Sequence, residues 1–206
     1  MTGKPHACVD LEGVPAPGIW PFLADRLGIA ALRPTTREVG DDRALMEQRI
    51  AALRRLGITL ARVLAIVSDL HPFPGAVDVL KHLASVARVV IVTDSFDPMN
   101  RALLDRLPSD AVLCHSFTHD EAGLVRGMAF WNALEGKHLC FDRFATDGSR
   151  TLAVGDALND LSMIRRASVG VLFRPPAVTL EKAGDVAVAH DDADILSRFR
   201  PRPAAG

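Results

Sequence analysis

The amino-acid sequence predicts an α/β protein with a Rossmann-like, doubly wound parallel sheet and an inserted helical cap. Two observations carry this prediction. Short apolar runs rich in β-branched residues alternate with helical patterns, as in sheets that helices cover on both faces. The first run, however, is followed by a long stretch, residues 14–74, without a comparable strand. A chain of 206 residues is long enough for one such domain with an insertion.

The predicted strands are buried and parallel, because each is a short, continuous apolar run that ends at small or acidic residues. They are Ala7–Val9, Val89–Val92, Leu152–Val154 and Val169–Phe173. Helical periodicity between them predicts the helices Ala76–Ala84, Pro98–Leu107, Glu135–Phe144 and Leu158–Ala167. Between Thr118 and Trp131, the residues HDEAG separate two short stretches in the manner of a hairpin turn.

The insertion is predicted to be helical, because three amphipathic or apolar patterns occur in it and two of them stop at glycine. The patterns are Ile19–Leu27, Arg43–Leu56 and Leu60–Leu70. We therefore expect a core domain at residues 1–13 and 75–200, a helical cap at residues 14–74, and a flexible tail at residues 201–206.

The composition excludes several classes of partner. The chain has 24 Lys plus Arg and 25 Asp plus Glu, whereas a nucleic-acid or anionic-membrane binder would favour a broadly basic surface. Its three cysteines are widely spaced and predict neither a disulfide framework nor a zinc site, so a reducing cytoplasm is the expected location. No apolar run has the length of a membrane span, and no secretory signal is found at the start. The composition does not distinguish a monomer from a homodimer.

The first candidate site follows the first strand. Asp10 and Glu12 lie two residues apart, hence on one side of an extended chain, and Gly13 allows the backbone to turn. Ligands of open α/β sheets bind beyond the carboxyl ends of the strands, where two such carboxylates favour a metal ion. A solvated acidic turn is the alternative when this motif is taken alone.

Two further strand ends supply polar groups. Thr93 and Asp94 follow Val92 and offer a hydroxyl and backbone N–H groups for a phosphate oxygen. Asp156 follows the third strand, and Asn159 and Asp160 lie in the next helical turn. Helix capping would need only one carboxylate, so this second acidic group predicts oxygen ligands for a hard cation such as Mg²⁺.

Lys137 precedes the third of these strand ends, at the beginning of a predicted helix. It is one of only four lysines, the others being Lys4, Lys81 and Lys182. A phosphate site with clustered carboxylates needs a fixed cation, so we interpret Lys137 as that cation rather than as a surface lysine.

Other titratable residues are interpreted as structural. His190-Asp191-Asp192 follows the apolar run Val186–Ala189 and is expected to begin the last helix rather than to bind a metal. The remaining candidates form no recognised ligand spacing and are interpreted as structural or surface residues; they are His71, His82, His115, His119 and His138.

Together, these motifs resemble those of the haloacid dehalogenase-like (HAD) phosphatase superfamily. The matching residues occur in the same order, with a cap after the first motif: Asp10-x-Glu12-Gly13, Thr93, Lys137 and Gly155-Asp156-x-x-Asn159-Asp160. More narrowly, the chain is similar to the phosphoserine phosphatase and homoserine phosphotransferase subgroup. That similarity rests on the stretches CVDLEGV, GIW, Thr35-Thr36-Arg37, LMEQR and LCH.

The resemblance implies a covalent mechanism. Asp10 is expected to attack phosphorus and form an aspartyl-phosphate, while Glu12 protonates the leaving alkoxide and then activates water. The same resemblance implies that Mg²⁺ binds the Asp10 carboxylate, the Glu12 backbone carbonyl and Asp156.

It also implies roles for the remaining motif residues. Asn159 and Asp160 are expected to support the metal site. The Thr93 side chain, the Asp94 backbone N–H and Lys137 are expected to hold the phosphoryl oxygens.

Substrate choice is expected to depend on the cap. Arg49 matches the arginine of the subgroup's M-x-Q-R stretch, which implies that it binds a substrate carboxylate. The subgroup has Glu before Ile-Trp, facing a substrate amine, whereas this chain has Gly18. A substrate that keeps the carboxylate but lacks or alters the amine is therefore one interpretation, and compensation by Asp25 or Asp41 is the other.

We thus expect a Mg²⁺-dependent phosphomonoesterase that acts on a small, carboxylate-bearing phosphorylated metabolite resembling phosphoserine. Phosphotransfer from Asp10 to homoserine or another small alcohol is one alternative. A catalytically weak protein that binds a phosphate ester is another, although Asp10, Glu12, Lys137 and Asp156 are all present. A hydrolytic dehalogenase has less need for Glu12 and Asp156.

Overall fold

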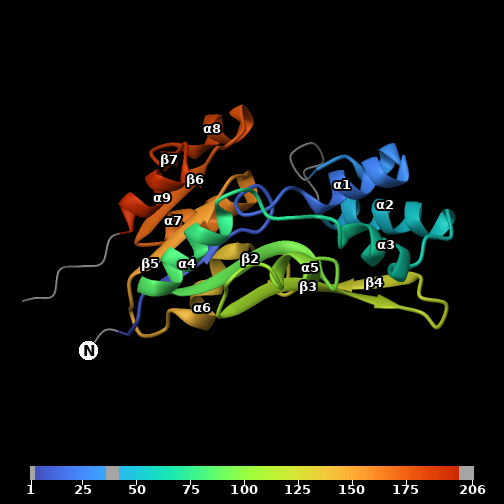
Figure 1. Ribbon diagram of the computed structural model, residues 1–206, viewed down its shortest axis with the longest axis horizontal. Helices are drawn as coiled ribbons and strands as arrows, with labels where there is room; N and C mark the ends of the chain where they lie inside the picture. The colour runs from blue at the N-terminus through green and yellow to red at the C-terminus, as the bar shows by residue number, and fades with distance from the viewer. Residues whose placement is uncertain (1–2, 36–41, 200–206) are drawn as a thin grey trace, which may run out of the picture.

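The computed structural model describes residues 3–35 and 42–199. The tail predicted at residues 201–206 and the candidate acid Asp41 lie outside these ranges. Within them, seven strands form one sheet in the order β4-β3-β2-β1-β5-β6-β7. Six strands are parallel, and β4 pairs antiparallel with β3 at one edge. The α/β prediction is confirmed, and Figure 1 shows helices on both sides of this sheet.

The sheet buries both faces, because successive side chains of each strand point to opposite sides. In β1, Ala7 and Val9 belong to one hydrophobic cluster and Cys8 to another. The first cluster includes residues of α4 (Ala76–Val86) and α9 (Asp192–Arg198), and the second includes residues of α6 (Cys140–Phe144) and α7 (Leu161–Arg166). This double burial explains why the core strands are continuous apolar runs. The strands are β1 (His6–Val9), β2 (Arg88–Asp97), β3 (Ala111–His119), β4 (Val125–Ala129), β5 (Thr151–Gly155), β6 (Val169–Phe173) and β7 (Ala187–Ala189).

The helices follow the predicted patterns, with shorter bounds in several places. The α-helices are α1 (Ile19–Leu27), α2 (Asp42–Arg55), α3 (Leu60–Val67), α4 (Ala76–Val86), α5 (Arg101–Leu104), α6 (Cys140–Phe144), α7 (Leu161–Arg166), α8 (Ala177–Ala183) and α9 (Asp192–Arg198). Short 3-10 turns are η1 (Ala30–Leu32), η2 (Lys137–Leu139) and η3 (Leu158–Asp160). In the described ranges, no helix is long and apolar enough to cross a lipid bilayer.

Several boundaries differ from the prediction. The helix expected at Pro98–Leu107 is limited to α5, because the chain first passes through a cis Asp97–Pro98 bond and a turn. The helix expected at Glu135–Phe144 begins two residues later and starts with a 3-10 turn at Lys137. The last helix begins where it was expected: Asp191 caps α9 by accepting a hydrogen bond from the Asp194 backbone N–H.

The predicted end of β2 is wrong. The strand was expected to stop at Val92, but it continues to Asp97. Its pairing with β3 shifts register between Val92 and Phe96, which leaves residues 93–95 at an irregularity in the strand. Because a bulge redirects side chains locally, Thr93 and Asp94 reach the ligand edge of the sheet without the strand ending there.

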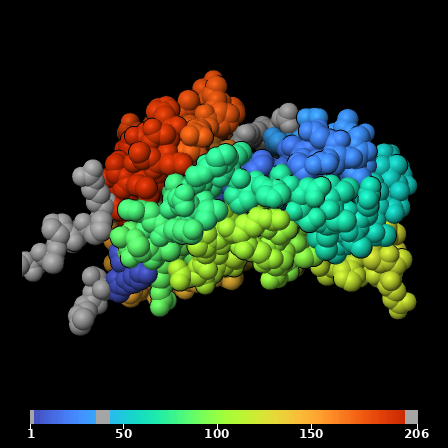
Figure 2. Space-filling view, in the orientation of Figure 1, coloured from blue at the N-terminus to red at the C-terminus, as the bar shows by residue number. Residues whose placement is uncertain are grey.

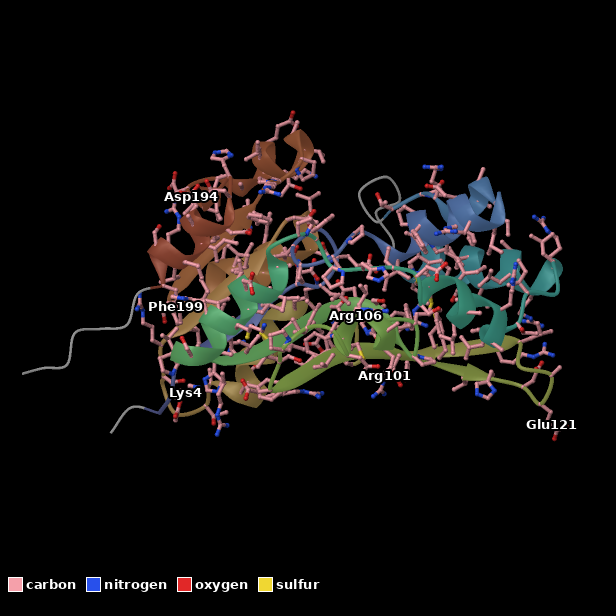
Figure 3. The ribbon with its side chains drawn as sticks, viewed as in Figure 1. Lys4, Arg101, Arg106, Glu121, Asp194 and Phe199 are labelled. Carbon is pink, nitrogen blue, oxygen red and sulfur yellow. The ribbon has the colours of Figure 1, made fainter. Side chains whose placement is uncertain are left out.

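Helices α1, α2 and α3 lie beyond the edge of the sheet, above the hairpin formed by β3 and β4 (Figure 1). Figure 2 shows their atoms and the hairpin in one lobe of the molecule. The Leu60 backbone N–H donates to the Gly123 carbonyl at 2.8 Å, and Ile50, Leu60 and Val125 form a small apolar cluster. Figure 3 shows Glu121 at the hairpin tip, at the opposite end of the molecule from Lys4. The hairpin thus supports α2 and α3 directly, and α1 packs on α3.

His6, at the beginning of β1, provides a test of the fold through its ionisation. The ring is buried, and its Nδ1 lies 3.0 Å from the Ser149 hydroxyl. Burial lowers the pKa of His6 below its ordinary value of about 6.5. Below that pH the unfolded chain takes up a proton that the folded chain does not, so stability is lost as the pH falls.

We therefore expect His6→Gln to remove part of the acid sensitivity. Free energies of unfolding from urea titrations between pH 7.5 and pH 5 should fall less for His6→Gln than for the wild type. Parallel curves for the two proteins would contradict the lowered pKa.

Candidate active site

The ends of β1 and β5 and the irregular part of β2 meet at one cavity of about 250 Å³. The parallel register brings them together, because Val9 pairs with both Ile91 and Val154. Nine of the ten predicted site residues line the cavity: Asp10, Glu12, Gly18, Arg49, Thr93, Asp94, Lys137, Asp156 and Asn159. Asp160, the tenth, lies fully buried behind it.

Lys137 connects the two acidic motifs. Its ammonium lies 2.7 Å from the Asp10 Oδ1 atom and 2.7 Å from the Asp160 Oδ1 atom. All three residues are buried, so these charge-assisted hydrogen bonds are shielded from water. The charges of Asp10 and Asp160 raise the pKa of Lys137 well above its ordinary value, against the opposing effect of burial. Lys137 is therefore a fixed cation beside the Asp10 carboxylate.

Asp160 also positions the loop after β5. Its Oδ2 atom accepts hydrogen bonds from the backbone N–H groups of Asp156 and Ala157, at 3.0 and 2.9 Å. Both of its carboxylate oxygens are thus engaged, one by the loop and one by Lys137. This arrangement holds Asp156 beside the end of β1.

The carboxylates can accommodate a cation. Oxygen atoms of Asp10, Asp156 and Asp160 all lie within 4.8 Å of one another. Burial and the charge of Asp160 raise the pKa of Asp10 well above its ordinary value, although Lys137 opposes this shift. When ionised, Asp10, Asp156 and Asp160 carry more negative charge than the single Lys137 ammonium offsets. A hard divalent cation that prefers oxygen ligands would offset the rest.

Glu12 follows β1, and its side chain reaches the first residue of α1. Its carboxylate accepts a hydrogen bond from the Ile19 backbone N–H, while its Oε1 atom is buried and has no hydrogen-bond partner among the described residues. Burial raises the pKa of Glu12, against the opposing effects of Ile19 and Arg49. A buried, unpaired acceptor that faces a cavity is suited to exchange a proton with a bound molecule.

Thr93 and Asp94 line the cavity from β2, the strand next to β1. The Thr93 hydroxyl oxygen accepts a hydrogen bond from the Ser95 backbone N–H at 3.0 Å. The Asp94 carboxylate accepts a hydrogen bond from the Asn159 amide at 2.7 Å and lies 3.8 Å from the Lys137 ammonium. Burial raises the pKa of Asp94, but Lys137 and hydrogen bonds from His115 and Asn159 more than offset this and lower it to about 2. Asp94 is therefore ionised at neutral pH.

Arg49 lines the part of the cavity that the helices form. Its guanidinium carbon lies 4.7 Å from the centre of the Trp20 ring, and one of its nitrogens donates to the Pro34 carbonyl. The side chain is buried although it carries a charge, so it is not the exposed arginine of an amphipathic helix. A guanidinium fixed in this way can bind a carboxylate with two hydrogen bonds.

Gly18 lies at the same end, directly before α1. A β-carbon built on Gly18 would be 3.9 Å from the Glu12 Oε2 atom and 3.2 Å from the Pro21 ring. Asp25, one of the candidate compensating acids, instead pairs with Arg33 on the exposed side of α1.

Three residues of the site were missed at the sequence level. Trp20 contacts Arg49, His115 contacts Asp94, and the buried Ser95 hydroxyl has no hydrogen-bond partner in the described part of the chain. The stretches GIW and LCH contain the first two, but nothing in their spacing indicates which side chain they contact. Ser95 follows Asp94 directly, yet its burial depends on the irregularity in β2.

Comparison with known proteins agrees with this fold. A family model described as haloacid dehalogenase-like hydrolase matches residues 13–168. The chain therefore belongs to the haloacid dehalogenase-like hydrolase family.

Within that family the chain is similar to phosphatases. It is 32% identical to "Phosphoserine phosphatase ThrH" of Pseudomonas aeruginosa over 193 residues, which cover 94% of each chain. It is 33% identical to "Phosphoserine phosphatase" of Pseudomonas syringae pv. tomato, with coverage of 94% of this chain and 81% of the relative.

Solved structures share the same fold. Apo phosphoserine phosphatase superposes with a TM-score of 0.78 at 19% identity, covering 96% of this chain and all of the other. A phospho-aspartyl intermediate analogue of phosphoserine phosphatase gives a TM-score of 0.79 at 19% identity, covering 97% of this chain and all of the other. At this identity the similarity supports the core and the arrangement of the helices, not a particular substrate.

The close approach of Gly13 to Asp156 can be tested by substitution. A β-carbon on Gly13 would lie 2.4 Å from the Asp156 carboxyl carbon, and the φ angle of Gly13 is 94°. Gly148 is a matched control, since its φ is 70° and no atom lies within 4 Å of its β-carbon position.

We expect Gly148→Ala to lower the free energy of unfolding by about 1–2 kcal/mol, through backbone strain alone. Gly13→Ala should lower it by at least about 1 kcal/mol more, because the methyl group also displaces Asp156. Equal losses in urea titrations would show that the carboxylate does not constrain position 13.

Proposed function

We propose that this protein is a Mg²⁺-dependent phosphomonoesterase for a small, carboxylate-bearing phosphorylated metabolite that resembles phosphoserine. One observation carries the proposal: the Asp10 carboxylate, held by Lys137, shares a cavity of about 250 Å³ with the buried guanidinium of Arg49. Such a cavity offers a nucleophile at one end and a carboxylate receptor at the other. The similarity to phosphoserine phosphatases over most of the chain supports the same reaction class.

In the first chemical step, Asp10 attacks phosphorus and the bond from phosphorus to the ester oxygen breaks, giving an aspartyl-phosphate. Glu12 donates a proton to the leaving alkoxide. In the second step, Glu12 takes a proton from water, which attacks phosphorus and restores the Asp10 carboxylate. The buried, unpaired Oε1 atom of Glu12 supports this role.

The remaining groups of the core bind the phosphoryl group. Lys137, the Thr93 side chain and the Asp94 backbone N–H would hold its oxygen atoms, and Asn159 and Asp160 would keep the neighbouring side chains in place. The Asp10 and Asp156 carboxylates, with the Glu12 backbone carbonyl, would bind Mg²⁺. When bound, Mg²⁺ offsets the repulsion between the Asp10 carboxylate and the phosphate.

Residues 14–74 would form a cap over this core, with residues 1–13 and 75–200 as the core domain. Helix α1 packs on α3, while α2 packs on β4 and α3 is hydrogen-bonded to the hairpin, all at one edge of the sheet, which supports this division. Arg49 on α2 would bind the substrate carboxylate from the cap side. The chemistry and the choice of substrate would thus reside in different parts of the chain.

The covalent mechanism is tested with Asp10→Asn. We expect kcat for phosphate release to fall on the order of 10³-fold or more, because an amide is a poor nucleophile. The exposed Asp105, on the surface after α5, provides Asp105→Asn as a control with unchanged turnover. The substrates are phosphorylated amino acids, hydroxy acids, sugars and nucleotides. Full turnover by Asp10→Asn would refute nucleophilic attack by this residue.

Metal dependence follows from the same assay. EDTA should abolish turnover by the wild type, and excess MgCl₂ should restore it, because the carboxylate cluster lacks sufficient counter-charge. Turnover that EDTA leaves unchanged would refute the metal site. With homoserine present, labelled phosphate found in the amino acid rather than free in solution would mark the protein as a phosphotransferase.

The amine site is tested at Gly18. We expect Gly18→Glu to raise kcat/KM for phosphoserine about 10-fold relative to 3-phosphohydroxypropionate, which lacks only the amine. Position 18 has ordinary extended backbone, so a side chain is accommodated if Pro21 yields slightly. Gly18→Gln is the matched neutral control. An unchanged ratio in Gly18→Glu would mean that the amine is bound elsewhere.

A further inference from the structure

His115 is a buried histidine that the proposed mechanism leaves without a role. It lies on β3, which pairs directly with β2, the strand that carries Thr93 and Asp94. Only 3% of its surface is exposed. Its Nε2 atom lies 3.5 Å from the Asp94 Oδ1 atom. His115 therefore contacts Asp94, which lines the cavity, without lining the cavity itself.

The tautomer of the neutral His115 ring follows from its second nitrogen. The backbone N–H of Trp131 points at the Nδ1 atom, with 3.3 Å between the two nitrogens. An imidazole nitrogen that accepts a hydrogen bond carries no proton, so the proton of the neutral ring lies on Nε2. His115 therefore presents an N–H group to the Asp94 carboxylate.

Aromatic neighbours fix the orientation of the ring. Phe96 and Phe130 contact it edge to face, with centroid distances of 5.1 and 4.8 Å. Rotation of the imidazole would break both contacts and the bond from Trp131. The direction of the Nε2–H bond is therefore set by the core and not by a ligand.

Asp94 transmits this orientation to the cavity. Its other carboxylate oxygen, Oδ2, accepts the Asn159 amide at 2.7 Å and lies 3.8 Å from the Lys137 ammonium. One oxygen of Asp94 thus faces His115, and the other faces two groups that line the cavity. A rotation of this carboxylate would move the acceptor away from Asn159.

We propose that His115 is a positioning residue, whose Nε2–H holds the Asp94 carboxylate so that Asp94 orients Asn159 and Lys137 toward the phosphoryl group. This inference rests on the proposed function, because it assigns a role in the same site. His115 itself touches no substrate. Outer groups of this kind typically change affinity or activity by about 10–100-fold when removed.

The test compares two variants of His115. His115→Phe keeps the aromatic packing but removes the donor, and we expect kcat to fall about 10-fold and KM to rise, because the phosphoryl group is held less firmly. His115→Gln places an amide N–H near the position of Nε2, and we expect it to recover most of the lost kcat. Unchanged kcat in a His115→Phe protein whose only defect is a lower Tm would overturn the proposal.

A double-mutant cycle shows whether the effect passes through Asp94. In an Asp94→Ala background, His115→Phe should change kcat less than about 2-fold, because the group that it orients is gone. The same 10-fold loss in both backgrounds would overturn the positioning role. This comparison remains informative if His115→Phe alone folds less stably.

Binding of inorganic phosphate, measured by calorimetry with MgCl₂, separates this inference from the proposed function. We expect His115→Phe to raise the phosphate Kd about 10-fold in the wild-type background and not in Asp94→Ala. A wild type that binds phosphate but cleaves no ester would refute the proposed function, while the Kd values still decide the role of His115. A wild type that does neither would refute both.

Discussion

The buried ammonium of Lys137 is the interaction on which the rest of the site depends. It joins Asp10 at the end of β1 to Asp160 before α7, two residues that the sequence separates widely. Desolvated carboxylates this close repel one another unless a cation lies between them. Lys137 therefore permits the acidic groups to gather, and Asp160 in turn holds the loop that carries Asp156.

The topology of the sheet explains why these groups meet. Because β1 lies between β2 and β5 and all three are parallel, the residues that follow β1 and β5 lie at the same edge as the irregular part of β2. At the same edge, the first residue of α1, Ile19, donates a hydrogen bond to the Glu12 carboxylate, and α2 contributes Arg49 to the cavity. The strands of the sheet and the helices α1 and α2 thus contribute residues to one site.

Most of the core and the cavity residues could be predicted from the sequence, because a buried parallel strand is a continuous apolar run and its end marks the ligand edge. Helix α1 could be predicted to its last residue, since Gly28 ends the pattern. Strand β3 could not, because Cys114, His115 and Ser116 interrupt its apolar pattern. The contact of His115 with Asp94 depends on the pairing of β2 with β3, which no local pattern encodes.

Strand β3 also has a geometric consequence. Its first half pairs with β2 inside the core, and its second half runs on to pair with β4 under the helices. The Leu60 backbone N–H at the beginning of α3 is hydrogen-bonded to Gly123 near the hairpin tip. The number of residues between His115 and the tip therefore sets the distance of α3 from the central strands. Shortening the hairpin by a pair of residues would alter the depth of the cavity over Asp10, and with it the size of the substrate that the cavity admits.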